Sequence, residues 1–230
     1  MGDFAANVIG IGALADPVRR DLYRYVCGQP SPVSREEAAT ALDLPPHQVK
    51  FHLDRLVRDG LLETGQARLT GRRGPGAGRP AKVYRRVGQE IAVSLPERSY
   101  ALAGDLLADA VSEAAASGRP VLDAVTATAT ERGHAIGRDC VAPATRRSER
   151  QARETVLTTL EAQGYEPRAD GGRVVMANCP FHALAQTHTD LVCGMNLALL
   201  DGLVSEVGGY RARLDPAEGR CCVVLEPVRR

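Results

Sequence analysis

Four cysteines near the end of this chain could together bind a metal centre. Cys179, Cys193 and Cys221 are separated by 13 and 27 residues, and Cys222 follows directly. At these intervals the thiols converge only through folding, unlike the ligands of a local zinc finger. Thiolates bind zinc, Cu(I) and iron–sulfur clusters, so the spacing indicates a thiolate centre and leaves the metal open.

The adjacent pair Cys221 and Cys222 is expected to begin the last strand of the chain. Neighbouring residues on a strand point to opposite faces, so one cysteine is expected to ligate and the other to pack or remain a free thiol. The fourth ligand position is then open to His182, His188, solvent or the second cysteine. His182 is favoured because it lies three residues after Cys179.

The same residues have two other interpretations. Cys179 with His182 could form the nucleophile and base of a thiol enzyme, but no orienting acid or oxyanion loop is evident beside them, so we do not expect an enzyme. Reduced cysteines are also common in protein cores, and Cys27 and Cys140 fit that role.

Basic residues are concentrated at the other end of the chain. Up to residue 89 there are 14 Lys and Arg against 9 Asp and Glu, and from residue 90 there are 15 against 19. The segment 68–86 contains seven basic residues and no acidic one, together with several glycines and prolines. This asymmetry places the attraction for a polyanion in the N-terminal part.

Three short helices are predicted before this basic segment. Asp16 can cap the first helix, with Pro17 at its first position. Ser34 and Glu37 form a capping box for the second, and Gly60 ends the third after about residue 59. This order predicts a helix-turn-helix.

The third helix is expected to be the recognition helix. Its apolar face carries Val49, Leu53 and Leu56. The candidate DNA-contacting residues on the helix are His47, Gln48, Lys50, Phe51 and Arg55. Gln and Arg side chains can read base edges, and Phe can contact a thymine methyl group, whereas a histidine at the helix start can contact phosphate.

A β-hairpin with a long basic tip is predicted directly after the recognition helix. Leu62 lies in the outgoing strand, and Val83 with Tyr84 marks the returning one. The candidate DNA contacts in this wing are Arg72, Arg73, Arg79 and Lys82. Arginines on a flexible tip can bind phosphates or enter a narrow minor groove.

The rest of the chain alternates helical and strand-like patterns. Helices are expected at 99–118, 120–137, 148–164 and 191–207, and strands at 165–168, 173–177, 210–214 and 221–225, with a loop at 142–147. The predicted fold is mainly α with an α+β C-terminal part. It comprises a winged helix-turn-helix domain (1–95), helices for dimerisation and linkage (96–140) and an α+β sensor domain with the cysteines (141–230).

The N-terminal segments resemble a known family of regulators. ALADPVRR at 13–20, HLDRLVRDGLL at 52–62 and the hairpin up to Tyr84 are similar to winged-helix regulators of the ArsR/DeoR type. The resemblance covers about the first 90 residues. It implies a homodimer that binds a pseudo-palindromic operator in double-stranded DNA.

Over most of its length the chain also resembles the iron–sulfur-responsive repressors of the suf operon (the SufR family). This resemblance implies a [4Fe–4S] cluster on Cys179, Cys193 and Cys221, with the doubled cysteine and the nearby histidines as departures. The expected function is a repressor that responds to redox state, iron or nitric oxide. The alternative from the residues is a zinc-binding or other metal-binding regulator.

A cytoplasmic location is expected for this chain. The N-terminus has neither the charged start nor the apolar run of a signal peptide, and no stretch reaches the roughly 18 apolar residues of a membrane helix.

Overall fold

The computed structural model describes residues 4–67, 80–141 and 148–228. The chain forms two compact units, Met1–Val93 and Ser94–Arg230. The helices predicted at 96–140 therefore belong to the same unit as the region 141–230. The three-domain division predicted from sequence becomes two units because these helices pack into the core of the second.

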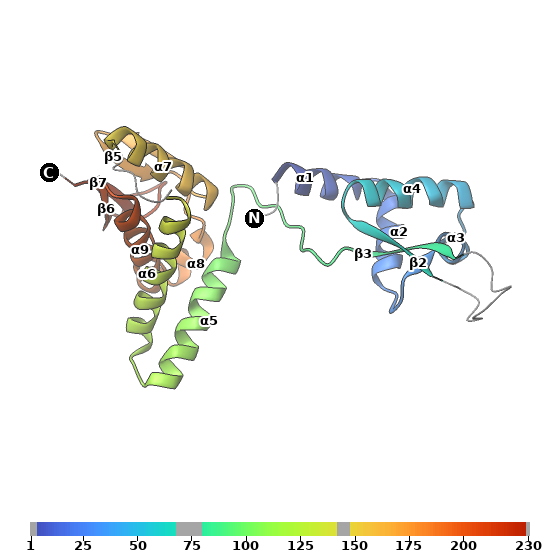
Figure 1. The fold of residues 1–230 in the computed structure, drawn as a ribbon, viewed down its shortest axis with the longest axis horizontal. Coiled ribbons are helices and arrows are strands. Elements are labelled where there is room, and N and C mark those ends of the chain that lie inside the picture. The colour runs from blue at the N-terminus through green and yellow to red at the C-terminus, as the bar shows by residue number, and fades with distance from the viewer. Residues whose placement is uncertain (1–3, 68–79, 142–147, 229–230) are drawn as a thin grey trace. The chain divides into compact units, whose positions relative to one another are not determined.

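The first unit consists of helices around a small sheet (Figure 1). The helices are α1 (Phe4–Ala13), α2 (Pro17–Cys27), α3 (Arg35–Leu42) and α4 (Pro46–Arg58). The strands are β1 (Val33–Ser34), β2 (Leu62–Ala67) and β3 (Ala81–Arg86), in the antiparallel order β1-β3-β2. This arrangement confirms the predicted helix-turn-helix followed by a hairpin.

Local signals in the sequence set the ends of these helices. The Asp16 carboxylate accepts a hydrogen bond from the backbone N–H of Arg19 at 3.0 Å, which caps α2. Ser34 and Glu37 form the predicted reciprocal capping box of α3. Asp43 then adopts a left-handed conformation with φ 52°, which allows the tight turn into α4.

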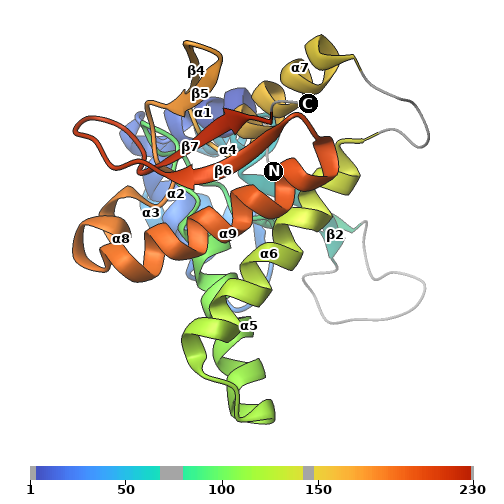
Figure 2. The same ribbon diagram turned by 90° about the vertical axis from the view of Figure 1, so that its left-hand side faces the viewer.

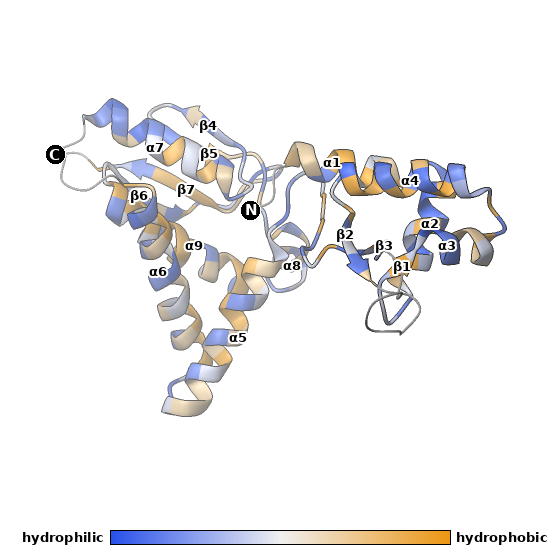
Figure 3. Ribbon diagram, turned by 45° about the vertical axis from the view of Figure 1, so that its right-hand side comes forward, coloured by the Kyte–Doolittle hydropathy of each residue, from blue (hydrophilic) through white to orange (hydrophobic). Residues whose placement is uncertain are grey.

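Helix α1 was not predicted from the sequence. Its ten residues, FAANVIGIGA, carry no charge, and Figure 3 shows the helix as largely hydrophobic. Gly10 lies against the end of α4, where an added Cβ would be 3.2 Å from the Asp59 carbonyl oxygen. The helix lacks the apolar–polar periodicity that is the main sequence signal of an α-helix.

The second unit is a helical layer against an antiparallel sheet (Figure 2). Its helices are α5 (Tyr100–Ser117), α6 (Val121–Asp139), α7 (Glu149–Ala162), α8 (His182–Thr187) and α9 (Thr189–Val207). Its strands are β4 (Pro167–Asp170), β5 (Arg173–Met176), β6 (Tyr210–Leu214) and β7 (Val223–Pro227), in the order β4-β5-β7-β6. The α+β character predicted for the C-terminal part is thus present in this unit.

Helices α6 and α9 cross in close contact (Figure 2). A Cβ on Gly133 of α6 would lie 2.0 Å from the Leu199 carbonyl oxygen of α9, and one on Gly202 would lie 2.3 Å from the Thr130 carbonyl oxygen. Only glycine permits this approach of two helix backbones. The crossing fixes α9, which carries Cys193, against α6.

Two sequence predictions near the cysteines need correction. Strand β7 begins at Val223, so Cys221 and Cys222 precede the strand rather than begin it. The short helix α8 follows Cys179 and was not predicted. The predicted loop at 142–147 lies outside the described residues. No helix in the described ranges has the length and apolar character of a membrane span.

Candidate DNA-binding face and thiol cluster

The recognition helix α4 presents the predicted face to solvent. Val49, Leu53 and Leu56 are fully buried, whereas Phe51 is 65% exposed. His47, Lys50 and Arg55 are exposed and Gln48 is half-buried. The amphipathic pattern of this helix is therefore confirmed, and its polar face is accessible to a ligand.

His52 lies on the inner side of α4. It is 8% exposed, and its ring packs edge-on against Phe51 with centroids 5.2 Å apart. Its Nδ1 atom is buried without a hydrogen-bond partner among the described residues. This burial makes His52 a packing residue rather than a reader of base edges.

Asp54 joins α4 to the wing strand β3. Its Oδ1 atom accepts hydrogen bonds from Lys82 Nζ at 2.6 Å and from the Tyr84 hydroxyl at 3.0 Å. Its Oδ2 atom lies 3.2 Å from Lys50 Nζ. Sequence reasoning missed this carboxylate because its partners come from 28 and 30 residues away.

These contacts change the acidity of both groups at the junction. Burial raises the pKa of Asp54, but hydrogen bonds from Lys82, Tyr84 and Lys50 outweigh it, so its pKa falls below the usual 3.8. Burial, and then the hydrogen bond to Asp54, raise the pKa of Tyr84 well above 10. At neutral pH the junction thus holds an ionised Asp54 carboxylate and a neutral Tyr84 phenol.

The other predicted contacts on this face are partly described. Lys82 lies on β3 and its ammonium is 5.0 Å from the centroid of the Tyr84 ring. Arg55 Nε is held 2.7 Å from Asp59 Oδ2, four residues further along the helix. The wing-tip residues Arg72, Arg73 and Arg79 lie outside the described residues.

The four C-terminal cysteines form two neighbouring pairs, which we call the thiol cluster (Cys179, Cys193, Cys221 and Cys222). Cys179 follows β5 and is hydrogen-bonded to Cys221. Cys193 Sγ on α9 lies 2.7 Å from Cys222 Sγ. Negative charge on Cys179 also raises the pKa of Cys193, so the two pairs interact electrostatically.

A buried polar chain supports the first pair. The amide of Asn196 donates to Cys221 Sγ at 3.2 Å, and the Tyr165 hydroxyl donates to Asn196 Oδ1. Asn196 is 1% exposed and Tyr165 is 3% exposed. Buried polar groups of this kind need partners, and these fix the orientation of the Cys221 sulfur.

The thiols differ in acidity. The hydrogen bond from Cys221 lowers the pKa of Cys179 to about 7, against an opposing effect of burial and with help from Arg98. The hydrogen bond to Cys179, and then burial, raise the pKa of Cys221. Burial, and then the contact with Cys222, raise the pKa of Cys193 to about 12. Cys179 is therefore the thiol best prepared to be a thiolate near neutral pH.

The Cys179 segment also holds the start of the second unit. The Asn178 amide donates to the carbonyl oxygens of Glu97 at 2.9 Å and Gly164 at 2.7 Å. Arg98 Nη1 donates to the Cys179 carbonyl oxygen at 3.0 Å and to the Asn178 side chain. Residues 97 and 98 belong to the segment that follows the first unit, so the backbone at Cys179 and the side chain before it are hydrogen-bonded to that connection.

The predicted histidine ligands are placed differently from the thiols. His182 and His188 are exposed, whereas Cys179, Cys193 and Cys221 are buried. Within residues 4–67, 80–141 and 148–228, no group of three or more Cys, His, Asp or Glu side chains has a metal-holding arrangement. Four neighbouring thiols have the donor chemistry of a soft metal centre, but here they stand as two pairs.

The two remaining cysteines lie apart from this cluster. Cys27 ends α2 in the first unit, where it is hydrogen-bonded to Tyr23, and Cys140 is exposed at the end of α6.

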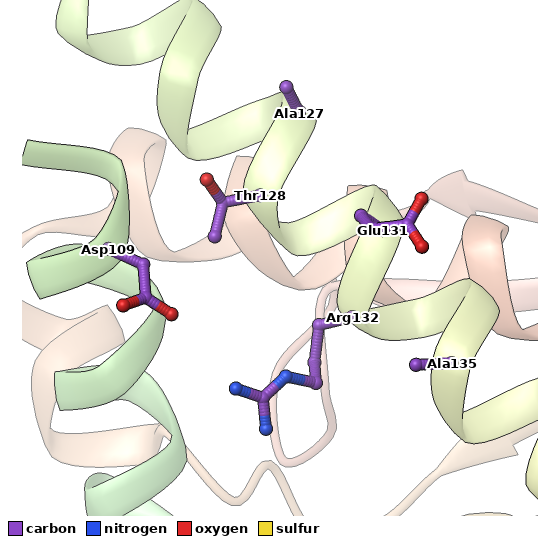
Figure 4. Close-up of a pocket in the computed structure, with 6 residues that line it drawn as sticks. All are labelled: Asp109, Ala127, Thr128, Glu131, Arg132 and Ala135. Atoms are coloured by element: carbon purple, nitrogen blue, oxygen red, sulfur yellow. The ribbon is translucent and has the colours of Figure 1, made fainter. Parts of the chain in front are cut away.

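An open groove of about 390 Å³ runs between α5 and α6. Figure 4 shows Arg132 of α6 reaching into the space beside α5, which carries Asp109. Large apolar side chains are exposed on the same helices: Val111 at 55%, Val121 at 50% and Leu122 at 65%.

Comparison with known proteins identifies the N-terminal part. Residues 14–65 match the family of the helix-turn-helix domain, over a stretch that includes α2, α3 and α4 and enters β2. The first unit thus contains a helix-turn-helix domain of the type found in DNA-binding transcription regulators. Comparisons with curated proteins and with solved structures gave no match.

Proposed function

We propose that this protein is a DNA-binding transcription repressor whose operator binding is controlled by an iron–sulfur cluster on the thiol cluster. The helix-turn-helix match and the exposed polar face of α4 support DNA binding. The single observation that supports control by a metal centre is that four thiols from three separate segments lie as two contacting pairs, Cys179 with Cys221 and Cys193 with Cys222.

Cys179, Cys193 and Cys221 are the proposed cluster ligands. All three are buried, and thiolates are the usual protein ligands of such clusters. A bound cluster supplies a link between the three segments that oxygen, nitric oxide or iron shortage can break. The fourth position belongs in this proposal to Cys222 or solvent rather than to His182, because the sulfur of Cys222 already contacts Cys193.

A change at the thiol cluster has two direct routes to the rest of the molecule. Asn178 and Arg98 connect the Cys179 segment to residues 97 and 98, which lead from the DNA-binding unit. Cys193 lies on α9, whose glycine crossing with α6 leaves no room for independent movement. We infer that losing a ligand bond at either cysteine alters how the connection or α6 is held.

The outer faces of α5 and α6 are the proposed dimer interface. Val111, Val121 and Leu122 are exposed there, and Asp109 and Arg132 could pair across a two-fold axis. Winged-helix domains commonly bind two-fold DNA sites as dimers. The partner that we propose for this surface is therefore a second copy of the chain. Sedimentation of the DNA-free protein at micromolar concentration should give twice the chain mass, with Leu122→Glu monomeric. Leu214→Glu, on β6, is the matched control.

The test of the proposed cofactor is anaerobic purification followed by absorbance, iron, sulfide and zinc analysis. A brown protein with iron and acid-labile sulfide is the expected result. Replacing Cys179, Cys193 or Cys221 with Ser should remove the iron, whereas Cys27→Ser and Cys140→Ser should retain it. A colourless, zinc-loaded protein would instead favour a zinc-binding regulator, for which four thiols are an ordinary ligand set.

The alternative of a thiol enzyme gains no support at Cys179. Its lowered pKa comes first from Cys221, and His182 lies exposed at the start of α8. We therefore propose no catalytic role.

A further inference from the structure

The cysteine at position 222 has no assigned role beyond a possible ligand, yet its sulfur is in close contact with a second thiol. Its Sγ atom lies 2.7 Å from Cys193 Sγ, across 29 residues of sequence. A disulfide needs a sulfur–sulfur distance of about 2.05 Å. The two sulfur atoms therefore need to approach by only about 0.7 Å to form the bond.

Accessibility distinguishes this pair from the other one. Cys222 is half-buried and next to it Cys193 is 7% exposed, so a small oxidant can reach the pair from the Cys222 side. Cys179 and Cys221 are both buried, and the Asn196 amide donates to the sulfur of Cys221. The hydrogen bond from Asn196 holds the sulfur of Cys221 in its present orientation, in contact with Cys179.

We propose that Cys193 and Cys222 form a reversible disulfide when the thiol cluster holds no metal. The oxidant is a peroxide, and the bond covalently joins α9 to the segment that precedes β7.

The reaction balances in two steps. The half-buried Cys222 sulfur attacks the peroxide, the O–O bond breaks, and the sulfur becomes a sulfenic acid while one water (or an alcohol) leaves. The Cys193 sulfur then attacks the sulfenic sulfur, the S–O bond breaks, and the thiol proton leaves with the hydroxide as a second water. The two thiols supply the two electrons that reduce the peroxide. A dithiol reductant reverses the bond by thiol–disulfide exchange.

The disulfide has a consequence for metal loading, and this part rests on the proposed function. Cys193 cannot be a thiolate ligand while it is bonded to Cys222. The oxidised protein would therefore be unable to bind a new cluster until a reductant restores the Cys193 thiol. In this way a brief exposure to peroxide would leave the protein metal-free until the disulfide between Cys193 and Cys222 is reduced.

Disulfide mapping of the full-length protein tests the bond itself. Metal-free protein, reduced and then freed of reductant, is treated with hydrogen peroxide, blocked and digested. Trypsin followed by a protease that cuts before Asp190 separates Cys179 (in 174–189) from Cys193 (in 190–200), and both from 221–229. We expect 190–200 linked to 221–229, and a loss of two of the six thiols.

Variants assign the partner within the adjacent pair. Cys221→Ser should retain the link, Cys222→Ser should abolish it, and Cys140→Ser is the control for an exposed cysteine outside the cluster. A link from 174–189, or no link in the wild-type protein, overturns the proposal. A link that persists in Cys222→Ser overturns it as well.

Iron loading separates this proposal from the proposed function. Oxidised and reduced wild-type protein are each supplied anaerobically with ferrous iron and sulfide, without added thiol. The expected result is loading of the reduced form and a loss of most of that loading in the oxidised form. Equal loading of both forms overturns the role of the disulfide. If the reduced form takes no iron, the cluster proposal fails, while the mapped bond still stands on its own.

Discussion

The side-chain amide of Asn178 donates to the carbonyl oxygen of Glu97 at 2.9 Å, so the residue before Cys179 is bonded to the connection from the DNA-binding unit. The same amide also donates a hydrogen bond to the carbonyl oxygen of Gly164, and the Arg98 guanidinium donates one to the carbonyl oxygen of Cys179. The buried side chain of Asn178, a residue that is 5% exposed, thus holds the segment that carries Cys179 against the connection at residue 97.

Replacing Asn178 with Ala should weaken the coupling between the thiol cluster and DNA binding. The substitution leaves the buried Gly164 carbonyl and the partly buried Glu97 carbonyl without their donor and should lower the free energy of unfolding by about 1–3 kcal/mol. Iron content should remain near that of the wild type, because no thiol is removed. The difference in operator affinity between the metal-loaded and metal-free forms should then be smaller than in the wild type, while the route through α9 and α6 remains.

Gln186→Ala is the control, since Gln186 is an exposed polar residue on the neighbouring α8. If Asn178→Ala kept the full wild-type difference in operator affinity, the connection through Asn178 would have no part in the switch. Denaturant unfolding and anaerobic DNA titration supply the two readouts.

Asp54 should stabilise the junction between the recognition helix and the wing. Asp54→Ala removes the acceptor of the buried Tyr84 hydroxyl and should cost about 1–2 kcal/mol of unfolding free energy near neutral pH. Because the folded-state pKa of Asp54 is lowered, its stabilisation is present above about 3.8 and is lost as pH falls through the lowered value. The difference between wild type and variant should therefore shrink below that pH.

Urea unfolding at several pH values measures this difference. Asp21→Ala, at an exposed position of α2, should change stability by less than about 0.5 kcal/mol. A loss for Asp54→Ala that stays constant into strong acid would show that the ionised carboxylate is not responsible.

The α6–α9 crossing should not accept a larger residue at Gly133. An added methyl group would lie 2.0 Å from a backbone oxygen, so Gly133→Ala should destabilise the second unit by about 3 kcal/mol or more. Gly104→Ala on α5 has no neighbouring atom within 4 Å and should be neutral or stabilising by about 0.5–1 kcal/mol. Thermal unfolding of both variants checks the contrast. Equal melting temperatures would mean that the helices are not packed as described.

The sequence predicted the elements whose signals are local. Asp16 and Ser34 cap helices as expected, and the antiparallel pairing of β2 with β3 agrees with the hairpin. Helix α1 lacks a polar face and was missed, because periodicity was the signal used.

The geometry of the thiol cluster was less accessible from sequence. Strand alternation implied that Cys221 and Cys222 serve different surroundings, but the residues lie before β7 and each contacts another thiol. The roles of Asn178, Asn196 and Asp54 depend on partners far along the chain, and a single sequence carries no local sign of such pairing.

The basic wing and the recognition helix should contribute differently to DNA binding. Replacing Arg72, Arg73 and Arg79 together with Ala should weaken binding to all DNA sequences and reduce the salt slope by about 2 to 3, if each arginine contacts one phosphate. Gln48→Ala should mainly reduce preference for the operator, by about 1–3 kcal/mol. Titrations on selected and scrambled duplexes at several salt concentrations measure both. A triple wing variant with unchanged affinity and slope would remove the wing from the interface.

Operator affinity of the wild-type protein with and without its metal centre tests the central claim most directly. One anaerobic preparation is divided, the centre is removed from one half with a chelator and the thiols are kept reduced, and both halves are titrated onto the same operator at one salt concentration. The account predicts affinities that differ by about tenfold or more, which requires only about 1.4 kcal/mol of coupling. Equal affinities for the loaded and the metal-free protein would contradict it.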